Sequence, residues 1–419
     1  MNLAIARCQL FFLASKAAVG AQTQFSPPTP RRRLAPLSAA REPPRAMGAG
    51  QSALVVECDE AAYRPGDAVG GVVAYQAAER LDIAGIRLQV EGREWAQCGA
   101  ASTSSATGAV DDFGGLGQSG GRTFLSTGAP LGGPGTLAPG QYSWPFKLQL
   151  PPGVPPSFFF ASGADSGRIE YTITATIVAA GALARNIATS RPLVVLAPDF
   201  ASGAPGAPPP PALSAEEDVV ACCCMGQGRA AAHAALDRGA FAAGETVRVA
   251  LQARNLSSAA FPSVELRLRR LVVLSAYGAG AGGYSSSRFA DTVAAAEFPG
   301  LAPGEVAEGP ATRQLALLLP PSLLGSAAGQ FVSCSYTLQV LLRSGPATSS
   351  LQVDLPLQVA AASPVGFVAP QAPPGWEPHT FAAVELPAAA SLEQQQQQAP
   401  PTYGAPPPTQ AQQYPPPKY

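Results

Sequence analysis

The sequence predicts an all-β protein in which two tandem β-sandwiches are followed by a disordered tail rich in proline and glutamine. Three observations lead to this prediction. Apolar and polar residues alternate along many stretches, turn signals containing glycine and proline separate these stretches, and one ordered set of motifs occurs twice. Alternation with a period of two is typical of antiparallel strands that have one face on a core and the other in water.

The first sandwich is predicted over residues 51–199. Its strands and turns are marked by alternation and by proline–glycine pairs. Strands are predicted at 53–57, 86–91, 146–150 and 169–177, and turn signals lie at 64–67, 138–140 and 151–153. The glycine- and serine-rich stretch 99–136 is expected to be a long loop, as is 276–296 further along, each a disordered insertion or a tolerated connection.

The second sandwich is predicted over residues 217–362, because the motifs of the first recur there in the same order. The offset is about 165 to 180 residues, the scale of a duplicated domain. The recurring pairs are 64–69 with 242–247, 137–140 with 301–304, 148–152 with 317–321, and 170–173 with 335–338. Between the copies, residues 200–216 are dense in proline, glycine and alanine and are predicted to form a stiff linker.

The length and composition fit this division. The chain has 419 residues, with 43 glycines, 44 prolines and 13% charged residues, enough for two domains that each bury a core. The net charge is −1, but residues 1–46 contain seven basic residues and one acidic residue, so they carry +6 and the remainder carries −7. Because no basic stripe remains in the body, we do not expect nucleic acid as a partner.

Residues 1–50 are expected to be a disordered or targeting segment. They are rich in alanine, serine, arginine and proline, with no acidic residue before Glu42, a composition typical of an organelle transit peptide. A different interpretation follows from residues 47–52, which spell M-G-x-x-x-S. If translation begins at Met47, Gly48 becomes a candidate for N-myristoylation.

The cysteines indicate a reducing compartment without a metal site. There are seven, an odd number, with no C-x-x-C pair, and the chain has only two histidines, His233 and His379. Two interpretations are open for Cys222, Cys223 and Cys224. They are either core and surface residues of a strand, or S-palmitoylation sites that would add to the weak hold of a single myristoyl chain.

No set of residues predicts catalysis or a cofactor. A Ser-His-Asp triad needs an ordered histidine, and His233 lies in an alanine-rich stretch without a partner motif. The glycines at 278–283 lack the Lys-Ser/Thr of a phosphate-binding loop, and Asp111-Asp112 lacks the further oxygen ligands of a calcium site. We therefore expect a binding protein.

The tail, residues 363–419, contains two P-P-x-Y motifs. One consists of Pro400, Pro401 and Tyr403 with Thr402 between them; the other consists of Pro416, Pro417 and Tyr419 with Lys418 between them. A proline pair fixes φ and forms a polyproline II ridge in advance, which docks into the aromatic groove of a WW domain at little ordering cost. The run of glutamines at 394–398 is expected to be a solvated spacer.

The two predicted sandwiches carry a specific resemblance over residues 52–361. Residues 63–71, 85–92, 142–151, 154–158 and 169–171 are similar to the arrestin N-domain, and residues 222–224, 244–247, 254–258, 332–342 and 351–359 are similar to the arrestin C-domain. Both domains are immunoglobulin-like β-sandwiches. With its P-P-x-Y tail, the chain resembles the α-arrestins, or arrestin-domain-containing proteins.

The resemblance implies an adaptor. α-Arrestins bring WW-domain HECT-type ubiquitin ligases to membrane transporters and receptors, which are then ubiquitinated and internalised. It places the protein in the cytoplasm, peripheral to the plasma membrane or endosomes. Membrane surface contact is a further expectation, to which the lipidation candidates named above would contribute. The ligase contact would fall on the six motif residues named above. The opening strand, 53–57, has no lysine pair to clamp a phosphate, so phospho-receptor recognition does not carry over.

Three other functions remain open. An arrestin-fold vesicle-sorting subunit, similar to the one in retromer, would act without a ligase and would not need the tail motifs. A structural cell-surface sandwich would need a secretion signal and paired cysteines. An enzyme would need an active site that the sequence does not indicate.

Overall fold

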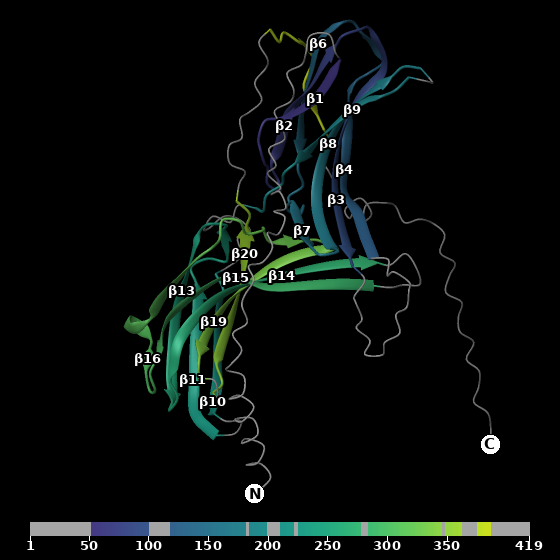
Figure 1. Cartoon of the computed structure of the whole chain (residues 1–419). Helices are drawn as coiled ribbons and strands as arrows, with labels where there is room; N and C mark the ends of the chain where they lie inside the picture. Colours follow the sequence, from purple (N-terminus) through teal and green to yellow (C-terminus); the bar gives the residue numbers. More distant parts are fainter. Residues whose placement is uncertain are drawn as a thin grey trace, which may run out of the picture. The chain divides into compact units, whose positions relative to one another are not determined.

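The computed structural model describes residues 52–99, 118–181, 184–198, 210–221, 225–277, 284–345, 348–362 and 375–386. These residues belong to one compact unit and form strands throughout (Figure 1). Within the described ranges, the 3₁₀ turn Gly309–Ala311 is the single helical element. No helix in that part of the chain has the length and apolar character needed to cross a membrane. The prediction of an all-β fold is confirmed.

The first sandwich packs two antiparallel sheets. Its strands are β1 (Ala53–Cys58), β2 (Ala68–Ala77), β3 (Leu81–Cys98), β4 (Gln118–Gly132), β5 (Gly135–Leu137), β6 (Gly140–Gln149), β7 (Phe158–Ser162), β8 (Asp165–Ala179) and β9 (Ile187–Leu193). One sheet has the order β1-β2-β6; the other has β4-β3-β8-β7, with β5 on β3 and β9 on β8. Along β8, Ile169, Tyr171, Ile173 and Ile177 are buried while their neighbours face outward, as the alternation predicts.

The second sandwich repeats the plan. Its strands are β10 (Ala212–Ala221), β11 (Met225–Leu236), β12 (Ala240–Ala242), β13 (Thr246–Ser257), β14 (Phe261–Tyr277), β15 (Tyr284–Leu301), β16 (Val306–Ala307), β17 (Arg313–Leu318), β18 (Ala327–Ala328), β19 (Val332–Arg343) and β20 (Leu351–Ala360). One sheet has the order β10-β11-β13-β16, with β17 also on β13; the other has β12-β20-β19-β14-β15, with β18 on β19. β10 begins at Ala212, inside the range predicted as linker.

The internal repeat extends to single hydrogen bonds. The turn before β2 and the turn before β13 both hold a glycine in the left-handed region, Gly66 with φ 89° and Gly244 with φ 88°. In each turn the acidic residue that follows the glycine accepts a backbone N–H at 2.7 Å, from Arg64 to Asp67 and from Ala242 to Glu245. The two sandwiches are therefore copies of one structural unit.

The prediction of long loops at 99–136 and 276–296 is wrong for the parts that the structure describes as strands, chiefly 118–132 and 284–296. β4 pairs with β3 along its whole length, and β15 pairs with β14. Both strands lie at the edge of their sheets. An edge strand forms backbone hydrogen bonds to a neighbour on one side only, and its side chains are less constrained by packing than those of a central strand. Glycine and serine are therefore tolerated in these strands. Residues 100–117 and 278–283 lie outside the described ranges.

Candidate partner-binding site

The residues predicted to bind partners or carry lipids lie outside the described ranges. This applies to Gly48, to Cys222, Cys223 and Cys224, and to Pro400, Pro401, Tyr403, Pro416, Pro417 and Tyr419. The three cysteines fall between the end of β10 at Ala221 and the start of β11 at Met225. The assignments to these residues stay predictions. The described part of the tail instead reveals a docking site on the first sandwich.

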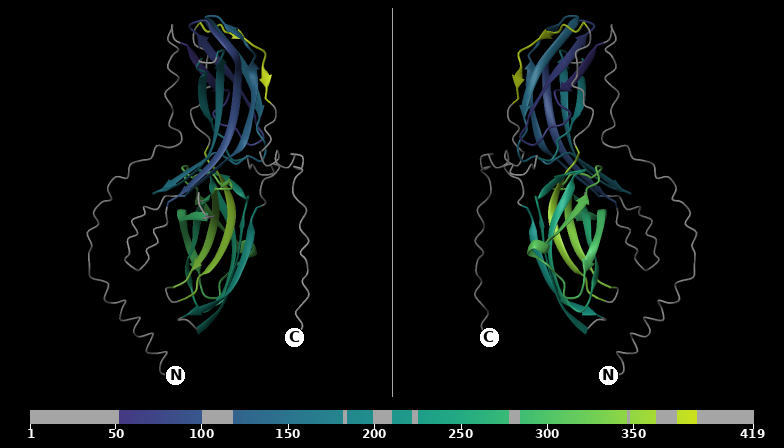
Figure 2. Two further views of the ribbon diagram at one scale, coloured as in Figure 1. Left: turned by 90° about the vertical axis from the view of Figure 1, so that its right-hand side faces the viewer. Right: turned by 90° about the vertical axis from the view of Figure 1, so that its left-hand side faces the viewer.

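Residues 375–386, here called the strap, lie along the outer edge of β6. They contain two short strands, β21 (His379–Thr380) and β22 (Val384–Glu385), which both pair with β6 in parallel. Figures 1 and 2 show the strap as the yellow segment beside the first sandwich. The backbone N–H of Phe381 donates to the Ser143 carbonyl at 2.9 Å, and that of Leu386 donates to the Lys147 carbonyl at 2.8 Å. The strap thus supplies the strand that the edge of β6 lacks.

Aromatic stacking holds the strap on this edge. The ring of Phe381 lies 5.1 Å from that of Trp144 with only 9° between their planes, and the Tyr142 ring stacks near both, 5.9 Å from Trp144 and 6.5 Å from Phe381. His379 meets Phe381 edge-on at 4.7 Å. Further along, Leu386 is buried. The strap therefore combines main-chain pairing with apolar anchors, which is the pattern of strand addition to a sheet edge.

The strap lies within residues 363–419, the range predicted to be a disordered tail, and it forms two short strands there. The signal was present but weak. Trp376, Phe381, Val384 and Leu386 are the large apolar residues of a stretch surrounded by proline, glutamine and alanine. The spacing of Val384 and Leu386 fits one face of a strand, but the run is too short to identify by alternation alone.

A second cluster joins the two sandwiches through Glu94 of β3, whose side chain is fully buried. Its Oε1 accepts backbone N–H groups of Phe331 at 2.7 Å and Val332 at 2.8 Å, and its Oε2 accepts that of Gln330 at 3.1 Å. The Nε of Arg122 on β4 adds an ion pair at 3.2 Å. Three backbone donors and one guanidinium compensate the cost of burying the carboxylate.

The approach of Glu94 to the 329–332 turn requires glycine at position 329. A Cβ added there would collide with Glu94 Oε1, so no other residue fits without a shift of the turn. Asp165 supports the same junction, because its Oδ1 accepts the Ser287 hydroxyl of β15 at 2.7 Å and the Gly99 N–H at 2.9 Å. Polar contacts to β3 and β8 therefore fix the second sandwich at this junction.

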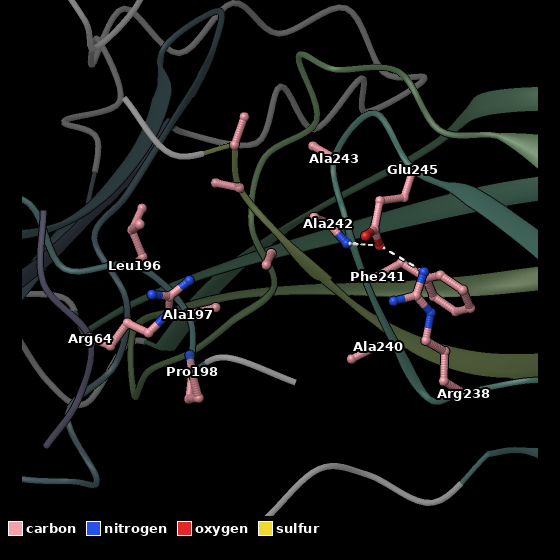
Figure 3. A pocket seen from close by; sticks show the side chains of 13 residues that line it. Arg64, Leu196, Ala197, Pro198, Arg238, Ala240, Phe241, Ala242, Ala243 and Glu245 are labelled. Atoms are coloured by element: carbon pink, nitrogen blue, oxygen red, sulfur yellow. Dashed lines mark hydrogen bonds and ion pairs between the residues drawn. The ribbon is translucent and has the colours of Figure 1, made fainter. Parts of the chain in front are cut away.

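A pocket of about 380 Å³ lies elsewhere along the two sandwiches (Figure 3). Arg64 lines one side, and the opposite side holds Glu245, which forms an ion pair with Arg238 at 3.0 Å. The Arg238 guanidinium also stacks over Phe241 at 4.6 Å. The remaining lining residues are alanine, leucine and proline. The lining contains no hydroxyl, thiol or imidazole side chain, so its residues offer charge and shape but no nucleophile.

The described thiols and His233 show no arrangement for chemistry. Cys58, Cys98 and Cys334 are free and buried, and burial raises the pKa of Cys334 to about 11. His233 Nδ1 lies 2.8 Å from the Ser214 hydroxyl, but no carboxylate within the described ranges hydrogen bonds to this histidine. In that same part of the chain, no group of three or more metal-ligating side chains could hold an ion.

Two protein-family models match the chain. The model for the arrestin (or S-antigen) N-terminal domain matches residues 54–198, and the model for the arrestin (or S-antigen) C-terminal domain matches residues 226–364. A search of curated proteins gives no match. The two models fall in order on the two sandwiches and together span more than half of the chain. The chain therefore belongs to the family of arrestin-domain proteins.

Proposed function

We propose that this protein is an α-arrestin-type adaptor that recruits WW-domain HECT-type ubiquitin ligases to membrane cargo for ubiquitination and endocytic sorting. The arrestin-domain family supports an adaptor role in trafficking in general. The observation that carries the finer proposal is the pair of P-P-x-Y motifs at 400–403 and 416–419. Two copies at the required offset in one tail favour a WW-domain partner over coincidence.

The two parts of the chain would divide the work. The sandwiches would bind a membrane transporter or receptor, and Pro400, Pro401, Tyr403, Pro416, Pro417 and Tyr419 would bind the ligase. The protein would act in the cytoplasm, at the plasma membrane or endosomes. Lipids on Gly48 or on Cys222, Cys223 and Cys224 would hold it there, since two anchors give a stable attachment that one myristoyl chain does not.

The first test is a titration of a WW-domain array with the peptide of residues 394–419. We expect micromolar binding that is lost when Tyr403→Ala and Tyr419→Ala are combined. The matched control is Tyr414→Ala, because Tyr414 lacks the proline pair two positions earlier and should leave binding unchanged. Binding that ignores the two motif tyrosines, or that needs Tyr414, would refute the proposal.

The competing function is an arrestin-fold sorting subunit that acts without a ligase. Deletion of residues 395–419 separates the two. If cargo sorting in cells survives the deletion, the sorting-subunit function is favoured, and if sorting is lost while cargo binding persists, the ligase adaptor is favoured.

A further inference from the structure

The first strand of the second sandwich, β10, is an open edge. It pairs with β11 on one side (Figure 1), and within the described ranges no other strand lies on its outer side. Its side chains are exposed on both faces of the sheet, because Val219 is the single buried residue of the strand. An exposed edge strand presents a row of backbone groups to which an extended peptide can add. β10 is therefore a candidate docking strand.

The register shows which backbone groups of β10 are open. The Leu236 N–H of β11 donates to the Pro211 carbonyl at 3.0 Å. Because antiparallel pairing alternates, every second residue from 213 to 219 directs its N–H and C=O to β11, and every second residue from 212 to 216 directs them outward. Near the other end of the strand, the Ser349 N–H donates to a β10 carbonyl at 3.0 Å and ends this open stretch.

The open edge is acidic. Glu216, Glu217 and Asp218 follow one another in β10. Arg229 of β11 forms ion pairs with two of them, at 3.4 Å to Glu216 and 2.9 Å to Asp218. Three carboxylates and one guanidinium leave a charge of −2 (−3 + 1) at this edge. Two longer edge strands have no such run, because β4 contains no acidic residue and the two in β15 are well separated.

The two faces of β10 offer different contacts. Glu216 and Asp218 project to the outer face of the sheet, whereas Leu213, Ala215 and Glu217 project to the opposite face. On that opposite face Leu213 is 46% exposed and Ala215 packs against the rim of the core. The side chains of an added strand alternate between the same two faces. A fitting peptide would therefore alternate lysine or arginine with apolar residues.

We infer that the open edge of β10 binds a basic, extended cytoplasmic segment of the membrane cargo by strand addition. This inference rests on the proposed function, which supplies the class of partner. Cytoplasmic segments beside transmembrane helices carry an excess of lysine and arginine, so their charge complements that of the edge. A second copy of this chain fits less well, because it would bring its own three carboxylates to the shared edge.

The test is a titration of the full chain with a labelled peptide of about ten residues in which lysine alternates with valine or threonine. We expect saturable binding that weakens as salt is added. Hydrogen-exchange mass spectrometry should show slower exchange of residues 210–221 in the complex. The matched peptide with glutamate in place of every lysine should not bind.

Variants of the protein separate backbone pairing from charge. Ser214→Pro removes an outward N–H, where an edge strand tolerates proline, and should weaken binding about fivefold; Ser214→Ala keeps this N–H and should not. Combining Glu216→Gln, Glu217→Gln and Asp218→Asn should weaken binding about tenfold, whereas Glu297→Gln on the edge strand β15 should have no effect. Thermal unfolding checks that each variant is folded.

The outcomes separate this inference from the proposed function. Absence of binding, or binding unchanged both by Ser214→Pro and by loss of the three carboxylates, would overturn the inference. Self-association of the chain that Ser214→Pro abolishes would overturn it in favour of a second copy as the occupant. Peptide binding with the expected properties, while every WW domain fails to bind the tail, would support the β10 site and overturn the ligase adaptor.

Discussion

β6 of the first sandwich and β17 of the second occupy equivalent places, yet within the described part of the chain only β6 carries a further strand. Each pairs with the strand that follows a left-handed glycine turn, Val69 with Leu148 and Val247 with Leu317. Each is followed by a proline pair, and the second proline of the pair lies next to the turn glycine, Pro152 beside Gly66 and Pro321 beside Gly244. On β6 the outer edge is paired with the strap. On β17, within the described ranges, the outer edge pairs with no strand.

The register identifies the side chain that makes the difference. Trp144 stands opposite Val73 in the first sandwich, and Arg313 stands opposite the equivalent Leu251 in the second. Trp144 offers a flat apolar face to Phe381, whereas Arg313 forms an ion pair with Glu305 at 2.6 Å. A duplicated scaffold can thus keep its turns and core while residues exchanged on one strand change what the edge of that strand accepts.

The largest effect in this comparison is expected from Trp144→Ala. Trp144 is among the largest fully buried side chains, and truncating such a residue costs about 3–5 kcal/mol of unfolding free energy. The matched variant Arg313→Ala removes a half-exposed ion pair and should cost about 1 kcal/mol or less. Denaturant unfolding measures both. Trp144→Ala, but not Arg313→Ala, should also speed hydrogen exchange of the strap amides. Similar deprotection by Arg313→Ala would contradict the role of Trp144 in binding the strap.

An intermediate and equal effect is expected from Tyr171→Phe and Tyr336→Phe. The buried Tyr171 hydroxyl donates to the Pro155 carbonyl, and that of Tyr336 donates to the Leu324 carbonyl at 2.7 Å. Each substitution leaves a carbonyl without its donor, at a cost of about 1–3 kcal/mol. Thermal unfolding of the two variants gives the comparison. If the two losses of unfolding free energy differ by well above about 1 kcal/mol, the equivalent hydrogen bonds do not stabilise the two sandwiches equally.

Of the substitutions made at matched positions of the repeat, the smallest effect is expected from the pair Gly66→Ala and Gly244→Ala. A Cβ added at Gly66 would lie 3.9 Å from Pro152, and one added at Gly244 would lie 3.7 Å from Pro321, both ordinary contact distances. The cost in unfolding free energy therefore comes from holding an L residue in the left-handed region, about 1–2 kcal/mol. We expect equal losses in the midpoint of urea unfolding. A neutral result at either position would mean that its turn relaxes out of the left-handed conformation.

The sequence predicted the fold well because both signals used are local. Alternation placed β8 within a few residues of its observed bounds, and the recurring motifs predicted the two sandwiches. Both signals fail for β4 and β15. In these two strands glycine and serine obscure the alternation. The strands form because β4 pairs with β3 and β15 pairs with β14 through backbone hydrogen bonds.

The strap and Glu94 could not be predicted from local patterns. The strap meets β6 more than two hundred residues away along the chain, and its four paired residues leave no periodic signal. Glu94 is one of three acidic residues in β3, and only the fold shows that three backbone N–H groups converge on it. The P-P-x-Y motifs, by contrast, were found from sequence alone because their chemistry lies in adjacent residues.

The parallel pairing of Tyr142 with His379 also has a consequence for the order in which the protein assembles during synthesis. β6 leaves the ribosome well before its partner, and at 5–20 residues per second the delay is roughly 10 to 50 s. During this time the second sandwich is made while the edge of β6 is open. A nascent chain with an unpaired edge can join another chain, so the first sandwich has a period of vulnerability that closes only after the strap has been synthesised.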